Sequence, residues 1–450
     1  MSPCSRLALA LAAAGKRAIS SAPRNSAVKD SLPKLAVTRR VEDSQPLLIK
    51  EIAAEVVARI SAGHAVVNLS QGVPCLPIFK EAEERMVNFL REGHLPYSHV
   101  AGIWSVRETA AKFVNHFYGT DFTADHTIIT AGGIQACFNT LALVVESKAD
   151  VVLSTLPAYS LYQAQTSYFG GTFAAMTSGS DGRLRPEALH AAFDEQRKAG
   201  RRVRCVCLCT PNNPTGVVMS RQEVEELASA LDLELAREPA GFLVLLDEVY
   251  LGLHDGAHVS LLQVASEQLR RRICLVLSAS KGLGAMPGAR AAWLTVGDKA
   301  LVPEMLKVQS AVSANASTIA QVGLEASLAH CMSDPKVLQQ VHDYYSTRIG
   351  FMVEQLNSLG QKYNLGVLCS HPRGAFYIWA DFSGLTAVEN DLQLQRLLLD
   401  RGVAVIPGSA FSISPSLKML RINCARDDME ELQTAVRIFD ETLAGLCGSS

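Results

Sequence analysis

Short and almost uninterrupted apolar runs recur along the first two thirds of the chain, between longer stretches of helical character. Strands that are buried on both faces look like this, because neither face meets water. The runs are His126–Thr130, Val151–Thr155, Val203–Thr210, Phe242–Leu246, Ile273–Leu277 and Ala291–Val296. The helix-like stretches between them are Gln135–Ser147, Pro186–Ala199 and Arg221–Arg237. This alternation predicts an α/β fold, a mostly parallel sheet covered on both faces by helices.

The pattern changes after about residue 300. Long helical segments are predicted over Leu301–Cys331 and Pro335–Gly360, with strands near Ala375–Ala380 and Val403–Ile406 and a last helix over Met429–Leu446. A chain of 450 residues, 48% of them hydrophobic, is long enough for two hydrophobic cores. We therefore expect a second, smaller α+β lobe.

The charge balance excludes some classes of partner. Lys and Arg number 42 and Asp and Glu number 44, so the formal net charge is −2. Nucleic-acid binders usually carry a marked basic excess, so no nucleic-acid partner is expected for this chain. No run of apolar residues is long enough for a membrane-spanning helix, and no membrane partner is predicted. Cys205, Cys207 and Cys209 alternate along an apolar run, which favours packed core residues over the alternative, a metal site.

The first 29 residues are basic, rich in serine and free of acidic residues up to Asp30. Such a segment is typical of a mitochondrial transit peptide, which we predict over residues 1–35. Two alternatives remain open, an uncleaved tail on a cytoplasmic protein and a secretory signal with its apolar part at Leu7–Gly15. The predicted localisation is therefore mitochondrial, with cytoplasmic as the alternative.

The residues suited to chemistry follow the predicted strands, where the loops of a parallel sheet gather functional groups. Ser278-Ala-Ser-Lys281 follows one strand, and a partly desolvated lysine there is a good imine former. Asp247-Glu-Val-Tyr250 and Asn213-Pro-Thr-Gly216 follow two others. Thr130-Ala-Gly-Gly-Ile-Gln135 joins a strand to a helix, where glycines let backbone N–H groups approach a phosphate. Taken singly, each motif also fits an ordinary loop.

Along the chain the motifs occur in a fixed order: the glycine turn, Asn-Pro-Thr-Gly, Asp-x-x-Tyr, Ser-x-Ser-Lys and finally Arg290. With its motifs in this order, the chain closely resembles the class I/II aminotransferases over roughly residues 45–445. These are the aspartate aminotransferase-like enzymes of fold type I, which depend on pyridoxal 5′-phosphate (PLP). The resemblance implies a large α/β domain over residues 86–330 and a small α+β domain built from 36–85 and 331–450. It also implies a homodimer with active sites at the subunit interface.

The resemblance assigns a cofactor, pyridoxal 5′-phosphate (PLP), and the residues that hold it. Lys281 would form the internal aldimine and then move the proton at the substrate α-carbon. Asp247 would pair with the pyridine nitrogen and keep the ring an electron sink, while Asn213 and Tyr250 would bond its phenolic oxygen. The remaining cofactor contacts that it implies are Tyr159, stacked on the ring, and, for the phosphate, Gly132, Gly133, Ile134, Ser278, Ser280 and Arg290.

Three more positions match the family pattern. Gly72 matches the glycine whose backbone faces the substrate carboxylate, and Arg421 the arginine that clamps it. Asn213 would lie against the substrate as well as the cofactor, and Tyr97 matches a tyrosine that reaches the phosphate of the neighbouring subunit. One residue more than usual separates Lys281 from Arg290, a departure from the family pattern at the residue expected to contact the phosphate.

The function that follows is transfer of an amino group from an L-amino acid to a 2-oxo acid. A carbon–sulfur β-lyase of the same fold is the alternative, and a non-catalytic binding module is a second. Lys281, Asp247 and Asn213 are all present, which argues against the second. No motif identifies a second arginine for a side-chain carboxylate, so aspartate, alanine, aromatic and branched donors all remain open.

Overall fold

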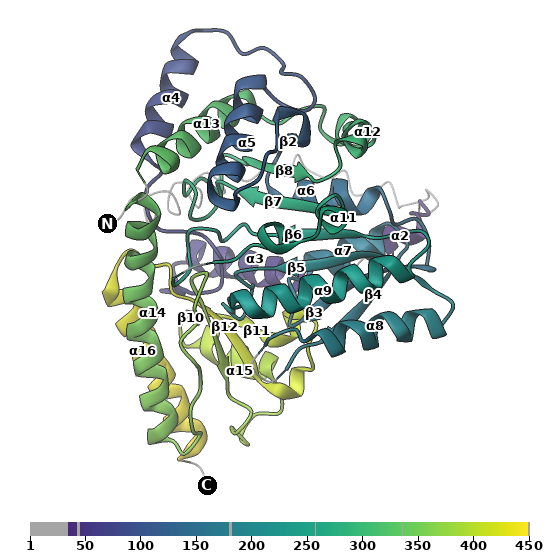
Figure 1. Ribbon diagram of the computed structural model, residues 1–450. Helices are drawn as coiled ribbons and strands as arrows, with labels where there is room; N and C mark the ends of the chain where they lie inside the picture. The colour runs from purple at the N-terminus through teal and green to yellow at the C-terminus, as the bar shows by residue number, and fades with distance from the viewer. Residues whose placement is uncertain (1–34, 43–45, 180–181, 257, 335, 449–450) are drawn as a thin grey trace, which may run out of the picture.

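A seven-stranded sheet forms the centre of the larger part of the molecule (Figure 1). The computed structural model describes residues 35–42, 46–179, 182–256, 258–334 and 336–448. The strand order is β2-β8-β7-β6-β5-β3-β4, and only β8 runs antiparallel to its neighbours. The strands are β2 Thr127–Thr130, β3 Asp150–Leu156, β4 Thr172–Thr177, β5 Arg202–Cys209, β6 Leu243–Asp247, β7 Ile273–Ser278 and β8 Ala292–Val296. The predicted α/β fold with a mostly parallel sheet is confirmed.

Every predicted apolar run forms a strand of this sheet, and β4 is the strand that the sequence analysis missed. β4 is an edge strand, and Met176 is the one buried residue of its six. Its sequence therefore lacks the continuous apolar character of the inner strands. On β5, Cys205 and Cys207 pack in one core, while Val206 and Leu208 pack in the core on the other face.

Helices cover both faces of the sheet (Figure 1). The helices of this part of the chain are α4 Lys80–Arg91, α5 Trp104–Tyr118, η1 Ala124–His126, α6 Gly133–Ala142, α7 Leu161–Tyr168, α8 Pro186–Lys198, α9 Arg221–Arg237, α10 Leu261–Val264, α11 Glu267–Arg270, η2 Lys299–Leu301, α12 Val302–Val312 and α13 Thr318–Ser333. Ser220 and Glu223 form a capping box that begins α9, which explains why its predicted start was correct. Within the described residues, no helix is both long and apolar enough to cross a membrane.

The long helix predicted over Leu301–Cys331 is wrong as a single element. It is interrupted between α12 and α13, where Ala314 adopts a φ of +57° and the Ser317 side chain caps α13. The sequence at the break, Ser313-Ala-Asn-Ala-Ser317, contains no glycine or proline, and its only signals are the turn-forming Asn315 and the capping Ser317. α13 packs against α4 and α5 and so belongs with the central sheet.

A second core lies in the C-terminal part of the chain, with N-terminal segments joined to it. Its elements are α3 Leu48–Ser61, β1 Val67–Asn68, α14 Lys336–Lys362, β9 Tyr377–Asp381, α15 Asp391–Asp400, β10 Val403–Ala404, β11 Ile406–Pro407, η3 Gly408–Phe411, η4 Pro415–Leu417, β12 Met419–Asn423 and α16 Met429–Cys447. The short helix α2 Arg39–Glu42, which precedes them, contacts α7 of the central-sheet part instead. β11, β12 and β9 form an antiparallel sheet, β1 pairs with β10, and α14 lies beside α16 (Figure 1).

The boundaries given for the two domains stay a prediction. The expected division after residue 85 falls inside α4, whose Ala82 packs in the core of the central sheet. The predicted transit peptide lies outside the described residues except for Leu35.

Candidate active site

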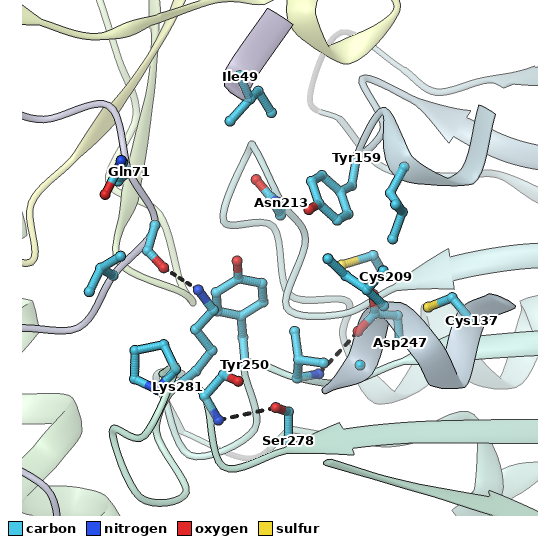
Figure 2. Close-up of a pocket in the computed structure, with 18 of the residues that line it drawn as sticks. Ile49, Gln71, Cys137, Tyr159, Cys209, Asn213, Asp247, Tyr250, Ser278 and Lys281 are labelled. Atoms are coloured by element: carbon cyan, nitrogen blue, oxygen red, sulfur yellow. Dashed lines mark hydrogen bonds between the residues drawn. The ribbon is translucent and has the colours of Figure 1, made fainter. Parts of the chain in front are cut away.

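A pocket of about 360 Å³ lies where the carboxyl ends of the parallel strands meet the second core (Figure 2). Strands β5, β6 and β7 each supply residues to its floor, and α6 and α7 supply one wall. The N-terminal turns of α3 also line it. The predicted site residues that line this pocket are Gly72, Gly133, Ile134, Tyr159, Asn213, Asp247, Tyr250, Ser278, Ser280, Lys281, Arg290 and Arg421. Residues hundreds of positions apart are thus gathered around one cavity.

Lys281 follows β7 and extends into this pocket (Figure 2). Its Nζ donates a hydrogen bond to the backbone oxygen of Gly72. The pKa of Lys281 is lowered to about 7, first by burial and then by the positive charges of Arg421 and Arg290, against the opposing effect of Asp247. At neutral pH a large fraction of this lysine is therefore the free amine, the form that attacks a carbonyl carbon.

Asp247 ends β6 and is buried at the floor of the pocket. Its Oδ2 accepts a hydrogen bond of 2.6 Å from the hydroxyl of Tyr162, and its Oδ1 accepts one of 3.3 Å from the backbone N–H of Val249. Burial raises the pKa of this carboxyl group, while the Tyr162 hydrogen bond opposes the rise. The carboxylate is thus fixed in place, with Tyr162 as an orienting partner that the sequence analysis missed.

Arg421, on β12, is a buried cation with neutral partners. It donates hydrogen bonds of 2.9 Å to Asn213 Oδ1 and 2.7 Å to the backbone oxygen of Ser70. Its Nε has no hydrogen-bond partner among the described residues. Arg421 is only 2% exposed, lines the pocket and pairs with no carboxylate among the described residues. Its guanidinium is therefore suited to bind an incoming carboxylate.

An anion cradle lies at the N-terminus of α6. Gly132 caps this helix with a φ of +86°, and a side chain there would place its Cβ 2.7 Å from Cζ of Arg290. The guanidinium of Arg290 is held by backbone oxygens, with hydrogen bonds of 3.0 Å to Pro287 and 3.5 Å to Ala131. A helix N-terminus, an adjacent arginine that has no acidic partner within the described part of the chain, and a position open only to glycine together fit a phosphate group.

The extra residue between Lys281 and Arg290 does not keep Arg290 from the pocket. The loop takes up the added length with left-handed backbone at Ala285, φ +51°, and at Arg290 itself, φ +61°. Beside it, the Ser278 hydroxyl accepts a hydrogen bond of 3.1 Å from the N–H of Ser280, which orders the turn before Lys281. The side chain of Ile134 is apolar, so only its backbone could contact an anion.

Two predicted residues are not among those that line the pocket. Gly132 lies directly behind its wall, against Arg290. Tyr97 is 92% exposed on the surface of the chain. Its predicted contact with the phosphate of a neighbouring subunit stays a prediction.

Several pocket residues were not predicted from the sequence. Tyr377 begins β9, and its hydroxyl lies 2.8 Å from that of Tyr250. Leu47, Ile49, Lys50 and Ala53 come from the segment at and before α3, which contains no motif. Cys137, Cys209 and Val249 also line the pocket, so Cys209 is not purely a core residue as expected. No sequence pattern pointed to Tyr162, because Tyr159 lies before α7 begins at Leu161 and the two residues share no helical face.

Comparisons with known proteins give one consistent result. The family described as aminotransferase class I and II matches residues 64–439. An aspartate aminotransferase of Thermotoga maritima is 30% identical, over 83% of this chain and 92% of the relative. An aspartate/prephenate aminotransferase of Thermus thermophilus is 28% identical, over 90% of this chain and 98% of the relative. The solved structure of the Thermus thermophilus aspartate aminotransferase with maleate has a TM-score of 0.80 at 25% identity, over 91% of this chain and all of the other.

Proposed function

Since the chain belongs to the class I and II aminotransferase family and is an aminotransferase, we propose that it holds pyridoxal 5′-phosphate on Lys281 and moves an amino group from an L-amino acid to a 2-oxo acid. The observation that carries this proposal is the buried Lys281, with its lowered pKa, in one pocket with Asp247 and the anion cradle. When bound, the pyridoxal ring supplies an electron sink for the substrate α-carbon.

The side chains around the pocket divide the remaining work. The N-terminus of α6 and Arg290 would hold the phosphate, and Asp247, fixed by Tyr162, would hold the proton on the pyridine nitrogen. Arg421 would bind the substrate α-carboxylate with the two-pronged geometry of a guanidinium. Lys281, as a free amine, would take the proton from the substrate α-carbon and deliver it to its new position.

We propose acidic amino acids, aspartate first, as the preferred donors. Two observations support this choice: the relatives are named aspartate aminotransferases, and Lys50 adds a cation at the exposed rim of the pocket. The charge of Lys50 is close enough to contribute to the lowered pKa of Lys281. Lys50→Met keeps the aliphatic stem and removes the charge, so it should lower kcat/KM for aspartate more than for alanine or leucine.

The alternative β-lyase is less well supported, because the relatives carry the names of aminotransferases. Both possibilities are tested by the visible spectrum of the purified protein, with single L-amino acids and no oxo acid. A yellow band that is lost when a donor is added, while the matching oxo acid forms once per site, supports amino-group transfer. Continuous release of pyruvate and ammonia from a cysteine-like donor would favour the lyase, and a colourless protein that stays colourless with added PLP would contradict the proposal.

We further propose a homodimer and a mitochondrial location. The homodimer rests on the family expectation and on the exposed Tyr97. The location rests on the basic, acid-free start of the sequence. Residues 1–35 fused to a fluorescent reporter should direct it to mitochondria, and a diffuse cytosolic signal would contradict this.

A further inference from the structure

Two buried tyrosines meet at the junction of the two cores. Tyr250 follows β6 of the central sheet, and Tyr377 begins β9 of the smaller sheet. Their hydroxyl oxygens are 2.8 Å apart, and the two residues are 3% and 1% exposed. No sequence motif pointed to Tyr377, and the functions assigned above leave it without a role.

Tyr377 also contacts two other parts of the pocket. The guanidinium carbon of Arg421 lies 4.3 Å from the centre of its ring, a cation–π contact. A Cβ on Gly72 would fall 3.0 Å from Cζ of Tyr377 and closer still to its hydroxyl, so Gly72 must be glycine for this packing. The backbone oxygen of Gly72 in turn accepts the hydrogen bond from Lys281. Tyr377 thus touches the carboxylate-binding arginine, the glycine that holds Lys281 and the phenol of Tyr250.

The arrangement restricts the positions of two protons. Burial raises the pKa of both phenols, so both keep their protons at neutral pH, and one hydroxyl must donate to the other. If Tyr250 donates to an anionic oxygen in the pocket, its own oxygen is left as an acceptor, and Tyr377 must be the donor. Arg421 opposes the rise in the pKa of both phenols, but its guanidinium lies over the ring of Tyr377, and the pKa of Tyr377 is raised less than that of Tyr250. The Tyr377 hydroxyl is therefore the better donor of the two. Hydrogen bonds in such a chain strengthen one another.

We infer that Tyr377 is a positioning residue that donates to Tyr250, and so orients and strengthens the hydrogen bond from Tyr250 to the phenolic oxygen of the cofactor. The inference rests on the proposed function. A hydrogen-bond donor to that oxygen stabilises its negative charge. It therefore lowers the pKa of the imine that Lys281 would form with the cofactor, which gives the visible band. Loss of the Tyr377 hydroxyl should therefore raise that pKa.

The test is a double-mutant cycle on the PLP-loaded protein, with the pKa of the visible band as the measurement. Tyr377→Phe keeps the ring over Arg421 and removes only the hydroxyl. It should raise this pKa by roughly 0.3 to 1 pH unit, the range expected for one hydrogen bond. Tyr250→Phe should raise it further, and Tyr377→Phe should add nothing in the Tyr250→Phe background. KM for the donor should change little in Tyr377→Phe, because Arg421 keeps its aromatic neighbour.

Tyr363→Phe is the matched control, since it removes a phenol from the same lobe whose hydroxyl contacts Asp440. The band of this control should titrate as in the unaltered protein. An unshifted pKa in Tyr377→Phe beside a shifted one in Tyr250→Phe would overturn the inference and leave the proposed function intact. Equal shifts from Tyr377→Phe in both backgrounds would also overturn it. An unshifted pKa in Tyr250→Phe, or a protein without a visible band, would instead remove the proposed role on which the inference depends.

Discussion

At the scale of single residues, the environment rather than the residue type makes Lys281 reactive. Because burial lowers its pKa to about 7, the amine is mostly protonated below this pH and mostly free above it. We predict that the cofactor-free protein takes up PLP slowly at pH 6, faster as the pH rises through 7, and at a constant rate from about pH 8. The measurement is the rate at which the visible band appears after PLP is added.

Lys281→Ala serves as the control for this titration and should show neither the band nor any turnover. A rate that kept rising toward the ordinary pKa of a lysine, 10.5, would contradict the predicted desolvation.

Tyr162 makes a second prediction at this scale. Its hydroxyl donates to Asp247, and the loss of a hydrogen bond to a buried charged group costs about 1.5–3 kcal/mol. Tyr162→Phe should therefore raise the pKa of Asp247 and lower kcat by roughly 10-fold or more. Tyr168→Phe, on the same helix but 38% exposed, is the matched control and should leave kcat unchanged. An equal loss in both variants would mean that α7 is merely destabilised.

At the scale of elements, the turn between β2 and α6 forms the anion cradle only with glycine at position 132. Its φ of +86° and ψ of 162° lie in a region that other residues enter at a cost of about 1–3 kcal/mol, and a Cβ would displace the Arg290 guanidinium. Gly132→Ala should weaken PLP binding at least 10-fold, measured by equilibrium titration of the cofactor-free protein.

Gly119→Ala is the control that distinguishes the effect of a positive φ from the effect of a steric clash with Arg290. Gly119 also has a positive φ, +66°, but a Cβ there meets nothing within 4 Å. This variant should lose about 1 kcal/mol of unfolding free energy and keep its affinity for PLP. Similar losses of affinity in the two variants would show that the turn acts through stability alone.

At the scale of the whole molecule, the predicted homodimer gives Tyr97 its role. Tyr97 is 92% exposed in the single chain and would reach the phosphate of the neighbouring subunit. We predict a dimer by light scattering. We also predict that Tyr97→Ala and Lys281→Ala proteins, both inactive or weak alone, recover activity when unfolded together and refolded as mixed dimers. One site of each mixed dimer then has both residues intact. If mixing restores no activity, Tyr97 does not act across subunits.

The apolar runs of the sequence were enough to predict the sheet and the residues next to its strands. Buried strands require continuous apolar runs, and Lys281, Asp247 and Asn213 follow such runs directly. Their place in the pocket could therefore be predicted, because parallel strands present their carboxyl ends at one edge. The edge strand β4 and the break between α12 and α13 were missed, since partial exposure and a break without glycine or proline leave little trace in composition.

The residues that complete the site could be identified only from the folded chain. Tyr377, Tyr162 and Lys50 come from three elements without a recognisable motif. Packing between the two cores brings Tyr377 and Lys50 to the pocket, while Tyr162 packs on the central sheet beside Asp247. The lowered pKa of Lys281 likewise depends on burial and on the charges of Arg290, in the same loop, and Arg421, which the second core brings from 140 positions away. Local sequence specifies strands, turns and the groups at their ends. Contacts between elements far apart in the chain depend on how side chains pack, and no local pattern records them.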